Sequence, residues 1–439
     1  MSSAASSPGP QGSGLVQSLR IGPTDVASKH PGWGQTPEYT GWRDEQIAWK
    51  TTCSLGDWSF LWDVVLEGPD ALKLFSDSGI NSVAKFDIGQ AKHLVQCNDA
   101  GKVITDGVLL RLSEDKFATQ STPAFYSAFL AASGDYDVSW REQKTFQYQV
   151  GGPNALEVME RVTGRTLTDI KFMRFEPVQI AGHDVLALRQ GMSGEIGFEL
   201  HGDQKFAVDV YDAVLTVGNE FGIRKLGSRT ALINHLEACF PTGGWHYLAD
   251  MYTTPGYGKF VVENFDLLGV KRGICGSFES EDVSDYMRSP VELGWGRSIK
   301  FDHEFRGRAA LEEEVANPRR QIVTLEFDRH DVERINGSLL EQGDAFDPLE
   351  IPLPQRYVMW ADKLMLDGQM VGTSCVPGYS YFFRKFLSLA YVEVEHAEPG
   401  TRLSVLWGNP GTPQTEIGVT VAAAPYKKDR RRTGLTTAK

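Results

Sequence analysis

A glycine-rich stretch in the middle of the chain reads Gly191-Met192-Ser193-Gly194-Glu195-Ile196-Gly197-Phe198-Glu199-Leu200. Its glycines recur at every third position, and the apolar run 185–188 precedes them. Glycine adopts the positive φ angles that a tight reversal requires. The stretch therefore predicts a strand, a turn and a returning strand.

Glu199 would stand at the start of the returning strand, where the hairpin fixes the direction of its carboxylate. A fixed carboxylate is a good partner for a flat group that offers two parallel N–H donors, as a guanidinium does. A pterin offers the same pair through a ring N–H and its exocyclic amine. The alternative is a glutamate that is merely solvated at the edge of the hairpin.

The composition indicates a globular protein of two or three domains, because 439 residues can bury more than one core. Hydrophobic residues make up 41% of the chain and charged residues 23%, which is ordinary for a soluble protein. The net charge of -13 argues against a nucleic-acid surface, which needs clustered Lys and Arg. No apolar run reaches about 18 residues, so we expect no membrane span.

The cysteines and histidines predict neither a disulfide framework nor a metal site. The five cysteines are widely separated and never form Cys-x-x-Cys, and the nine histidines show no His-x-x-x-His spacing. A reducing cytoplasm is the compartment that this cysteine usage favours.

Both ends of the chain are expected to lie outside the folded domains. Residues 1–37 begin with a segment rich in Ser, Gly and Pro and carry no signal-peptide pattern, so we expect them to be disordered. Residues 427–439 include the basic run Lys427-Lys428-Asp429-Arg430-Arg431-Arg432, which we interpret as a solvated tail.

Two similar units follow each other in residues 38–318. A strand over 62–68 leads into a helix over 69–80, and residues 146–156 repeat the plan of a strand, a Gly-Pro turn and a helix. We therefore predict two related α+β lobes. Residues 319–426 contain short alternating segments separated by Gly, Pro and Asp, which predict a separate β-rich domain.

An ordered set of motifs resembles the folate-dependent aminomethyltransferase family, typified by the T-protein of the glycine cleavage system. The matching segments are 66–71, 101–106, 191–199, 226–229, 294–296, 305–311 and 377–380. The resemblance spans residues 40–426 and implies an α+β fold, a three-domain cloverleaf with folate in the central hole. In the family's Gly-Tyr-Thr-Gly-Glu-x-Gly-x-Glu run the second glutamate grips the pterin. Glu199 matches it here, and Met192 replaces the usual tyrosine.

The resemblance implies tetrahydrofolate as cofactor and assigns further residues to it. Arg229, in the Gly-Ser-Arg turn, would meet the carboxylate end of folate, unless it only caps a helix or pairs internally. Thr105 replaces the first of two aspartates that the aminomethyltransferases carry, which argues against a glycine-derived donor. Met192 and Tyr379 are the remaining residues that we expect to bind folate. Nothing in the chain indicates a surface for a carrier protein, so no carrier partner is expected.

The chain is more closely similar to tetrahydrofolate-dependent aryl-ether enzymes, which include vanillate and syringate O-demethylases and a sesamin methylene transferase. The matching segments are 42–49, 70–77, 103–107, 300–305 and 403–408. Demethylases of aromatic acids carry an arginine where this chain has Ser121, and histidines within 58–62. These departures favour a neutral, larger donor such as a methylenedioxyphenyl lignan. The alternative is an acid-binding arginine placed elsewhere. The donor-binding candidates are Trp58, Phe60, Ser121 and Trp245.

Breaking an aryl ether releases a phenolate whose conjugate acid has a pKa near 10, so a tyrosine is a well-matched proton donor. The aromatic insertion 245–252 supplies Tyr247 and Tyr252 as candidate acids, with His246 as the alternative. Asp106 could stabilise positive charge on folate N5. The aromatic residues could equally form only the pocket wall.

Three other functions stay open at this point. The donated group could be a methyl rather than a methylene. A non-catalytic folate-binding accessory protein would share the cloverleaf without transferring carbon. The folate domain of a flavin-linked dimethylglycine oxidoreductase is disfavoured, because no Gly-x-Gly-x-x-Gly follows a strand.

Overall fold

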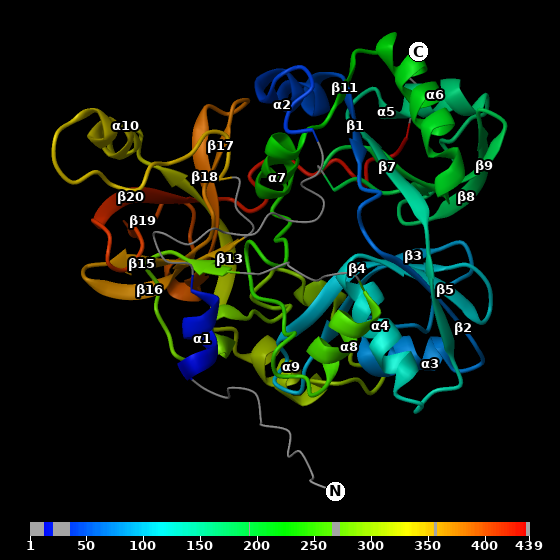
Figure 1. The fold of residues 1–439 in the computed structure, drawn as a ribbon, viewed down its shortest axis with the longest axis horizontal. Coiled ribbons are helices and arrows are strands. Elements are labelled where there is room, and N and C mark those ends of the chain that lie inside the picture. The colour runs from blue at the N-terminus through cyan, green and yellow to red at the C-terminus, as the bar shows by residue number, and fades with distance from the viewer. Residues whose placement is uncertain (1–12, 21–35, 193, 266–272, 355–357, 436–439) are drawn as a thin grey trace, which may run out of the picture.

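A computed structural model describes residues 13–20, 36–192, 194–265, 273–354 and 358–435. It places two α/β lobes beside each other and a β-barrel against both (Figure 1, lobes on the right, barrel on the left). Among the described residues, no helix combines the length and apolarity that crossing a bilayer would need.

The first lobe is built on a sheet with the strand order β3-β4-β5-β2-β6. Its elements are β2 (Asp63–Glu67), α3 (Ala71–Ser78), β3 (Ala91–Cys97), β4 (Val103–Arg111), β5 (Lys116–Gln120), α4 (Thr122–Ala132) and β6 (Ser139–Gln143). The apolar faces of α3 and α4 pack on this sheet around buried aromatic rings, among them Phe75 and Phe117. Burial of such rings is the main favourable contribution to the stability of the lobe.

The second lobe repeats that plan. Its elements are β7 (Thr145–Gly151), α5 (Ala155–Thr163), β8 (Phe175–Ile180), β9 (His183–Arg189), β10 (Gly197–Asp203), α6 (Ala207–Asn219) and β11 (Ile223–Lys225). The strand order β8-β9-β10-β7-β1-β11 matches that of the first lobe, except that β1 (Cys53–Asp57) is inserted before the last strand. The prediction of two related lobes is therefore confirmed.

The glycine-rich turn joins β9 to β10, as predicted. Gly194 has a φ of 74°, which favours glycine, and a Cβ on Gly191 would lie 2.6 Å from the Glu195 carbonyl oxygen. The turn therefore needs glycine at both positions for two different reasons. It places Glu199 in β10, where it pairs with Gln149 of β7 and Leu188 of β9.

The C-terminal domain is a closed barrel. Its strands follow the order β13-β20-β19-β15-β16-β18-β17, and a further pairing of β13 with β18 closes the sheet. The barrel elements are β13 (Arg320–Phe327), α10 (Arg329–Gly337), β15 (Asp362–Leu366), β16 (Gln369–Ser374), β17 (Gly378–Ser380), β18 (Lys385–Glu393), β19 (Arg402–Trp407) and β20 (Thr415–Ala422). The β-rich domain predicted after residue 319 is this barrel.

Further elements connect the lobes and the barrel. α7 (Ser228–Glu237) lies between them in Figure 1 and contacts α2 (Trp42–Thr51), β17 and β18. The helices and strands outside the two lobes and the barrel are α1 (Ser13–Leu19), α2 (Trp42–Thr51), α7 (Ser228–Glu237), α8 (Tyr257–Asn264), β12 (Gly273–Cys275), α9 (Arg308–Ala316) and β14 (Val358–Trp360). Short 3₁₀ helices lie at Gln204–Phe206, Val283–Tyr286, Gly296–Ser298, Ser338–Leu340 and Val394–His396.

Helix α1 corrects one expectation for the N-terminal segment 1–37. Val16 and Leu19 are buried in an apolar cluster with Ile274 and Met359, and Arg20 donates a 2.9 Å hydrogen bond to the Gly276 carbonyl. Burial of these side chains outweighs the Ser- and Gly-rich composition around them. Residues 1–12 and 21–35 lie outside the described residues.

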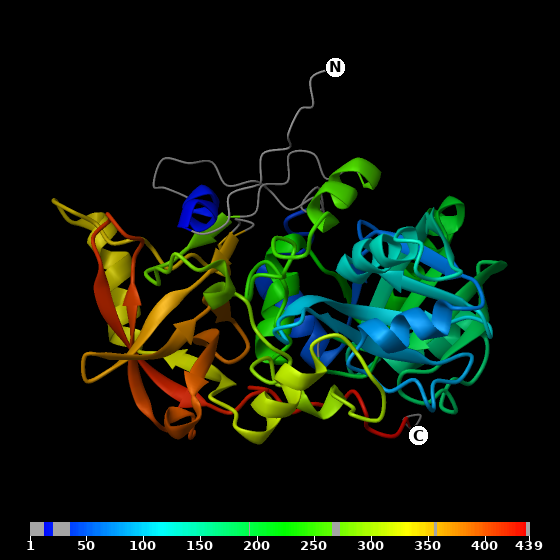
Figure 2. The same cartoon turned by 90° about the horizontal axis from the view of Figure 1, so that it is seen from below.

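The interpretation of residues 427–439 as a solvated tail holds for most charged side chains of the described part, since Lys428, Arg430 and Arg432 are exposed, but the segment itself packs against the second lobe. Figures 1 and 2 show the C-terminal chain leaving the barrel and running along the second lobe. Lys427 is buried, and the backbone N–H of Arg430 donates to the Gly194 carbonyl at 2.8 Å. Leu435 is buried in the core of the second lobe. A charge run alone does not reveal such long-range backbone pairing.

Candidate active site

A cavity of about 1440 Å³ opens where the two lobes, α7 and the C-terminal segment meet. Sites for a single small molecule usually measure about 300–1,000 Å³. The cavity is therefore large enough for two ligands side by side. Both lobes, the segment 238–245 and residues 424–432 contribute to its wall.

Glu199 forms a polar corner of this cavity. Its side chain is buried, and Gln190 Nε2 donates to Glu199 Oε1 at 2.6 Å while Gln149 Nε2 approaches the same oxygen at 3.4 Å. Glu199 Oε2 accepts no hydrogen bond from the described residues, although His201 Nε2 lies 3.5 Å away. One oxygen of a fixed carboxylate is thus left to accept from a ligand.

Two other buried polar atoms in residues of the cavity wall also lack a hydrogen-bond partner in the described part of the chain. Gln147 Oε1 and Trp58 Nε1 have no hydrogen-bond partner among the described residues. Buried polar groups normally have partners, so these atoms indicate a ligand with matching donors and acceptors. A pterin has adjacent N–H donors that could bind Glu199 Oε2 and Gln147 Oε1, and it has acceptor atoms for the Trp58 indole N–H. The residues present therefore fit a reduced folate.

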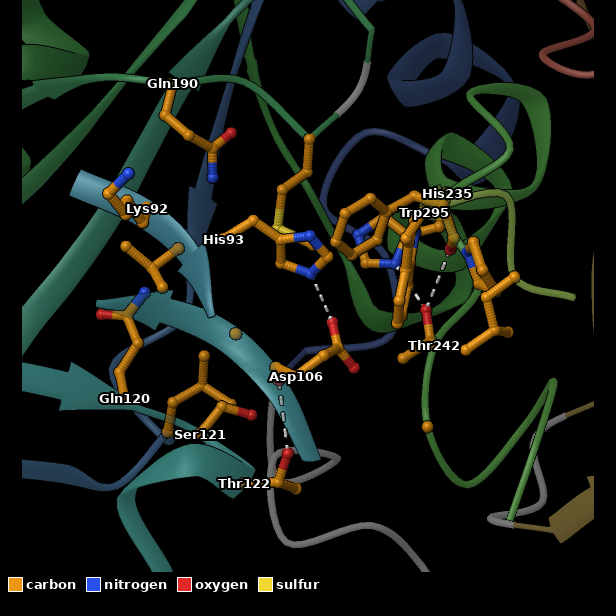
Figure 3. A pocket seen from close by; sticks show the side chains of 18 of the residues that line it. Lys92, His93, Asp106, Gln120, Ser121, Thr122, Gln190, His235, Thr242 and Trp295 are labelled. Atoms are coloured by element: carbon orange, nitrogen blue, oxygen red, sulfur yellow. Dashed lines mark hydrogen bonds and ion pairs between the residues drawn. The ribbon is translucent and has the colours of Figure 1, made fainter. Parts of the chain in front are cut away.

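A second polar group is centred on Asp106. In the β3–β4 ladder Val95 pairs with Asp106 and His93 with Val108, so His93 lies diagonally across from Asp106 on the same face. His93 Nε2 lies 2.9 Å from Asp106 Oδ2, and Figure 3 shows the two side chains facing each other. Both residues line the cavity.

Tyr247 contacts Asp106 from the side that faces away from the cavity. Its hydroxyl donates a hydrogen bond to Asp106 Oδ1, and its side chain is buried outside the cavity lining. Burial raises the pKa of Tyr247 well above its usual value, and the Asp106 carboxylate adds to this effect. The phenol therefore stays protonated and holds the orientation of the carboxylate. Tyr252, by contrast, lines the cavity directly.

Asp250 fixes the segment that carries both tyrosines. Its carboxylate accepts from Asn98 Nδ2 at 2.8 Å and from the backbone N–H groups of Tyr252 and Thr253 at 3.2 and 2.8 Å. The backbone N–H of Asp250 itself donates to the Val103 carbonyl at 3.0 Å, at the start of β4. The segment is therefore tied to the strand that carries Asp106.

The assignment of His246 as an acid is wrong. His246 is buried outside the cavity lining, and its Nδ1 accepts the backbone N–H of Thr242 at 2.9 Å. Burial lowers the pKa of His246 to about 4 and that of the neighbouring His235 to about 3. Both imidazoles are neutral near pH 7. His235 lines the cavity and stacks on Trp58.

The buried state of His246 predicts an acid-dependent loss of stability. Between pH 6.5 and about 4 the unfolded chain binds a proton at His246 that the folded chain does not, so folding weakens as the pH falls. In His246→Gln the slope of the unfolding free energy against pH should fall by about 1.4 kcal/mol per pH unit. Urea unfolding between pH 4.5 and 6 measures this slope. The exposed His330→Gln is the control, and parallel curves for His246→Gln and the wild type would contradict the prediction.

Several residues expected at the site do line the cavity. They come from both lobes and from the segments between them. These residues are Trp58, Phe60, Asp106, Ser121, Met192, Glu199, Trp245 and Tyr252.

Three expected folate residues do not line the cavity. Arg229 forms an ion pair with Glu38 and donates to the Ile351 carbonyl at 2.7 Å, which is the internal pairing left open above. Tyr379 packs edge-on against Trp42 at the barrel surface. Thr105 is buried beneath Thr122, with 2.6 Å between the two hydroxyl oxygens. Because position 105 lies behind the cavity wall, its change from aspartate says little about the donor.

Other cavity residues were not foreseen. His93 could have been found from strand alternation, which places it on the same side of the sheet as Asp106 once β3 and β4 are paired. Gln147 and Gln190 are polar side chains in or next to strands, and nothing in their local sequence marks them. Arg431 and Arg432 line the cavity only because the C-terminal segment folds back over the second lobe.

Comparisons with known proteins agree with this geometry. Residues 26–254 match the family model of the GCVT N-terminal domain. A sesamin methylene transferase from Sinomonas sp. is 35% identical over 410 residues, covering 89% of each chain. A syringate O-demethylase from Sphingobium sp. is 34% identical over 417 residues, covering 90% of each. An aminomethyltransferase from Halalkalibacterium halodurans is 27% identical over 393 residues, 85% of this chain and 88% of its own.

A solved structure supports the fold. The glycine cleavage system aminomethyltransferase T from Bartonella henselae superposes with a TM-score of 0.67 and 18% identity, covering 95% of this chain and 97% of its own. The predicted arrangement of two α+β lobes and a C-terminal β domain is thereby confirmed. The chain belongs to the GCVT family of tetrahydrofolate-dependent one-carbon transferases.

Proposed function

We propose that this enzyme removes the bridging carbon of a neutral methylenedioxyphenyl compound, such as a sesamin-type lignan, and gives a catechol and 5,10-methylene-tetrahydrofolate. One observation carries the proposal. The same cavity contains the Glu199 carboxylate, whose Oε2 accepts no hydrogen bond from the described residues, and, on another wall, the Asp106–His93 pair. The first can bind a reduced pterin and the second can move a proton.

The folate side is assigned to Glu199, Gln147 and Trp58. When bound, tetrahydrofolate would supply two amines, N5 and N10, which replace the two phenolic oxygens on the bridging carbon in turn, and each amine proton would end on the oxygen that is released. Arg431, which pairs with Asp429, and Arg432 lie on the cavity wall and could receive the folate carboxylates. These arginines replace Arg229 in that role.

The protein's own contribution to the chemistry centres on Asp106. Its carboxylate can take up the proton that the folate amine loses and pass it to the departing phenolate oxygen. Tyr247 and His93 each hold one of its oxygens, so the carboxylate keeps a single orientation. Tyr252 places a second phenol directly on the cavity wall. The remaining acceleration comes from holding both reactants together, which can contribute about 7–11 kcal/mol.

The donor side is assigned to aromatic and hydroxyl side chains. Phe60 and Trp245 supply flat apolar surfaces, and the start of α4 presents Ser121 and Thr122. Trp58, which was predicted on the donor side, is assigned to folate instead. Figure 3 shows Ser121 and Thr122 beside Asp106. None of these donor-side residues is charged, which supports an uncharged donor.

A methoxy-aromatic acid is the second candidate donor, and Lys92 is the observation that favours it. Lys92 lines the same cavity beside His93 and could bind a carboxylate. The reaction would then be an O-demethylation that gives 5-methyl-tetrahydrofolate. One ether bond would break in this reaction. The methyl group would pass to the folate amine, and the amine proton would end on the phenolic oxygen.

A donor panel under anaerobic conditions tests the proposal. The purified protein is incubated with tetrahydrofolate and, separately, a bis(methylenedioxyphenyl) lignan, vanillate and syringate, and both products are analysed by mass spectrometry. We expect a catechol and 5,10-methylene-tetrahydrofolate from the lignan only. Turnover of the acids to 5-methyl-tetrahydrofolate would replace the first candidate with the second. No folate-linked product from any donor would overturn both.

A further inference from the structure

The cavity has an apolar end between α4 and α8 that the proposed chemistry does not use. The residues that line this end come from the two helices and two neighbouring segments. We name this surface the α8 wall, and it consists of Trp62, Phe125, Met251, Gly258, Val261 and Val262.

The α8 wall is continuous with the core of the first lobe. Trp62 and Phe125 are in edge contact with ring centroids 5.4 Å apart, and Val261 belongs to the same apolar cluster as Phe125. Val262 is 52% exposed, so the apolar lining extends from the interior to the mouth. No member of the wall carries a charge or a side-chain hydrogen-bonding group except the Trp62 indole.

The wall begins about one helical turn from the Asp106 side of the cavity. Thr122, at the first turn of α4, accepts from Thr105 and lies beside Asp106, and Phe125 follows about one helical turn later. A donor with its ether at Asp106 would therefore reach the α8 wall with any substituent larger than one ring. An uncharged ring system is the group that such a surface stabilises.

Gly258 provides the space in this wall. A Cβ added there would meet only the Met251 carbonyl oxygen, at 3.5 Å, which is an ordinary contact. Glycine is a poor helix former, and packing does not require it at this position of α8. A larger side chain would occupy the cavity that Gly258 lines.

We propose that the α8 wall is a subsite for the second, uncharged ring system of a two-ring aryl-ether donor, with Gly258 as the residue that sets its size. This inference rests on the proposed function. It adds that discrimination between one-ring and two-ring donors is made at α8, on the side of the cavity away from Glu199.

Gly258→Phe tests the subsite, with Lys259→Phe as the matched control. Lys259 is the next residue of α8, but its side chain is 77% exposed, pairs with Glu263 and does not line the cavity. The donors are 1,2-methylenedioxybenzene and a bis(methylenedioxyphenyl) lignan. Gly258→Phe should lower kcat/KM for the lignan at least about tenfold and change kcat/KM for the one-ring donor less than threefold. Lys259→Phe should leave both values unchanged.

The one-ring donor shows that the variant is folded and active. Equal losses for both donors, or no loss for either, would overturn the subsite while the proposed function stands. If the wild type turns over neither donor, the proposed function fails and the subsite fails with it. Gly258→Ala adds a graded point and should give a smaller loss for the lignan.

Discussion

Asp106→Asn should lower the single-turnover rate by about 10²- to 10⁴-fold, the usual contribution of a positioned acid–base group. Asparagine keeps the shape of the side chain and can still accept from the Tyr247 hydroxyl. It cannot take up a proton, and its amide nitrogen cannot accept from His93. Tetrahydrofolate affinity should stay within threefold of the wild type, because Asp106 does not contact the Glu199 corner. Rapid-quench measurement of catechol formation gives the rate.

Asp99→Asn is the control for this variant, because Asp99 is an exposed aspartate of the same lobe that pairs with Arg306 outside the cavity. It should turn over at the wild-type rate. A fully active Asp106→Asn enzyme would remove Asp106 from the mechanism.

Tyr247→Phe separates positioning from proton transfer within the same network. If Tyr247 acts through Asp106, the double variant Asp106→Asn/Tyr247→Phe is no slower than Asp106→Asn alone, since residues that act as a unit are not additive. Fully additive losses would instead assign Tyr247 a catalytic role of its own.

Glu199→Gln should weaken tetrahydrofolate binding by about 10- to 100-fold. A hydrogen bond to a charged group contributes about 1.5–3 kcal/mol, and every 1.4 kcal/mol is a factor of ten in affinity. Glutamine has the same shape, but it carries no charge and offers one acceptor oxygen where the carboxylate offers two. Anaerobic titration calorimetry measures the dissociation constant.

Glu176→Gln is the matched control for Glu199. Glu176 lies on β8 of the same lobe, pairs with Arg165 at the surface and does not line the cavity. The affinity of the Glu176→Gln variant for tetrahydrofolate should equal that of the wild type. An affinity of Glu199→Gln within twofold of the wild type would show that this carboxylate does not hold the pterin.

The local features of the fold could be predicted from the sequence. The glycine spacing around Gly194 specifies the β9–β10 hairpin and with it the position of Glu199. The repeated strand–turn–helix units specify two lobes, because each unit encodes its own local structure. The barrel strands are visible because alternation and turn residues are short-range signals.

The features that could not be predicted depend on contacts between distant segments. Arg229 was expected to meet folate, but Glu38, far away in the chain, pairs with it instead. Lys427 was expected to be solvated, but its backbone N–H donates to Glu237 and its side chain is buried. His246 is neutral only because of the residues packed around it. Sequence pattern does not report burial of this kind.

The most direct measurement is a single turnover with a methylenedioxyphenyl donor that carries ¹³C at the bridging carbon. Enzyme in excess over donor is mixed anaerobically with tetrahydrofolate, and the folate fraction is analysed for the label. The proposed function predicts one labelled 5,10-methylene-tetrahydrofolate for each catechol formed, and no catechol when tetrahydrofolate is left out. Catechol formed without tetrahydrofolate, or without label in the folate fraction, would contradict it.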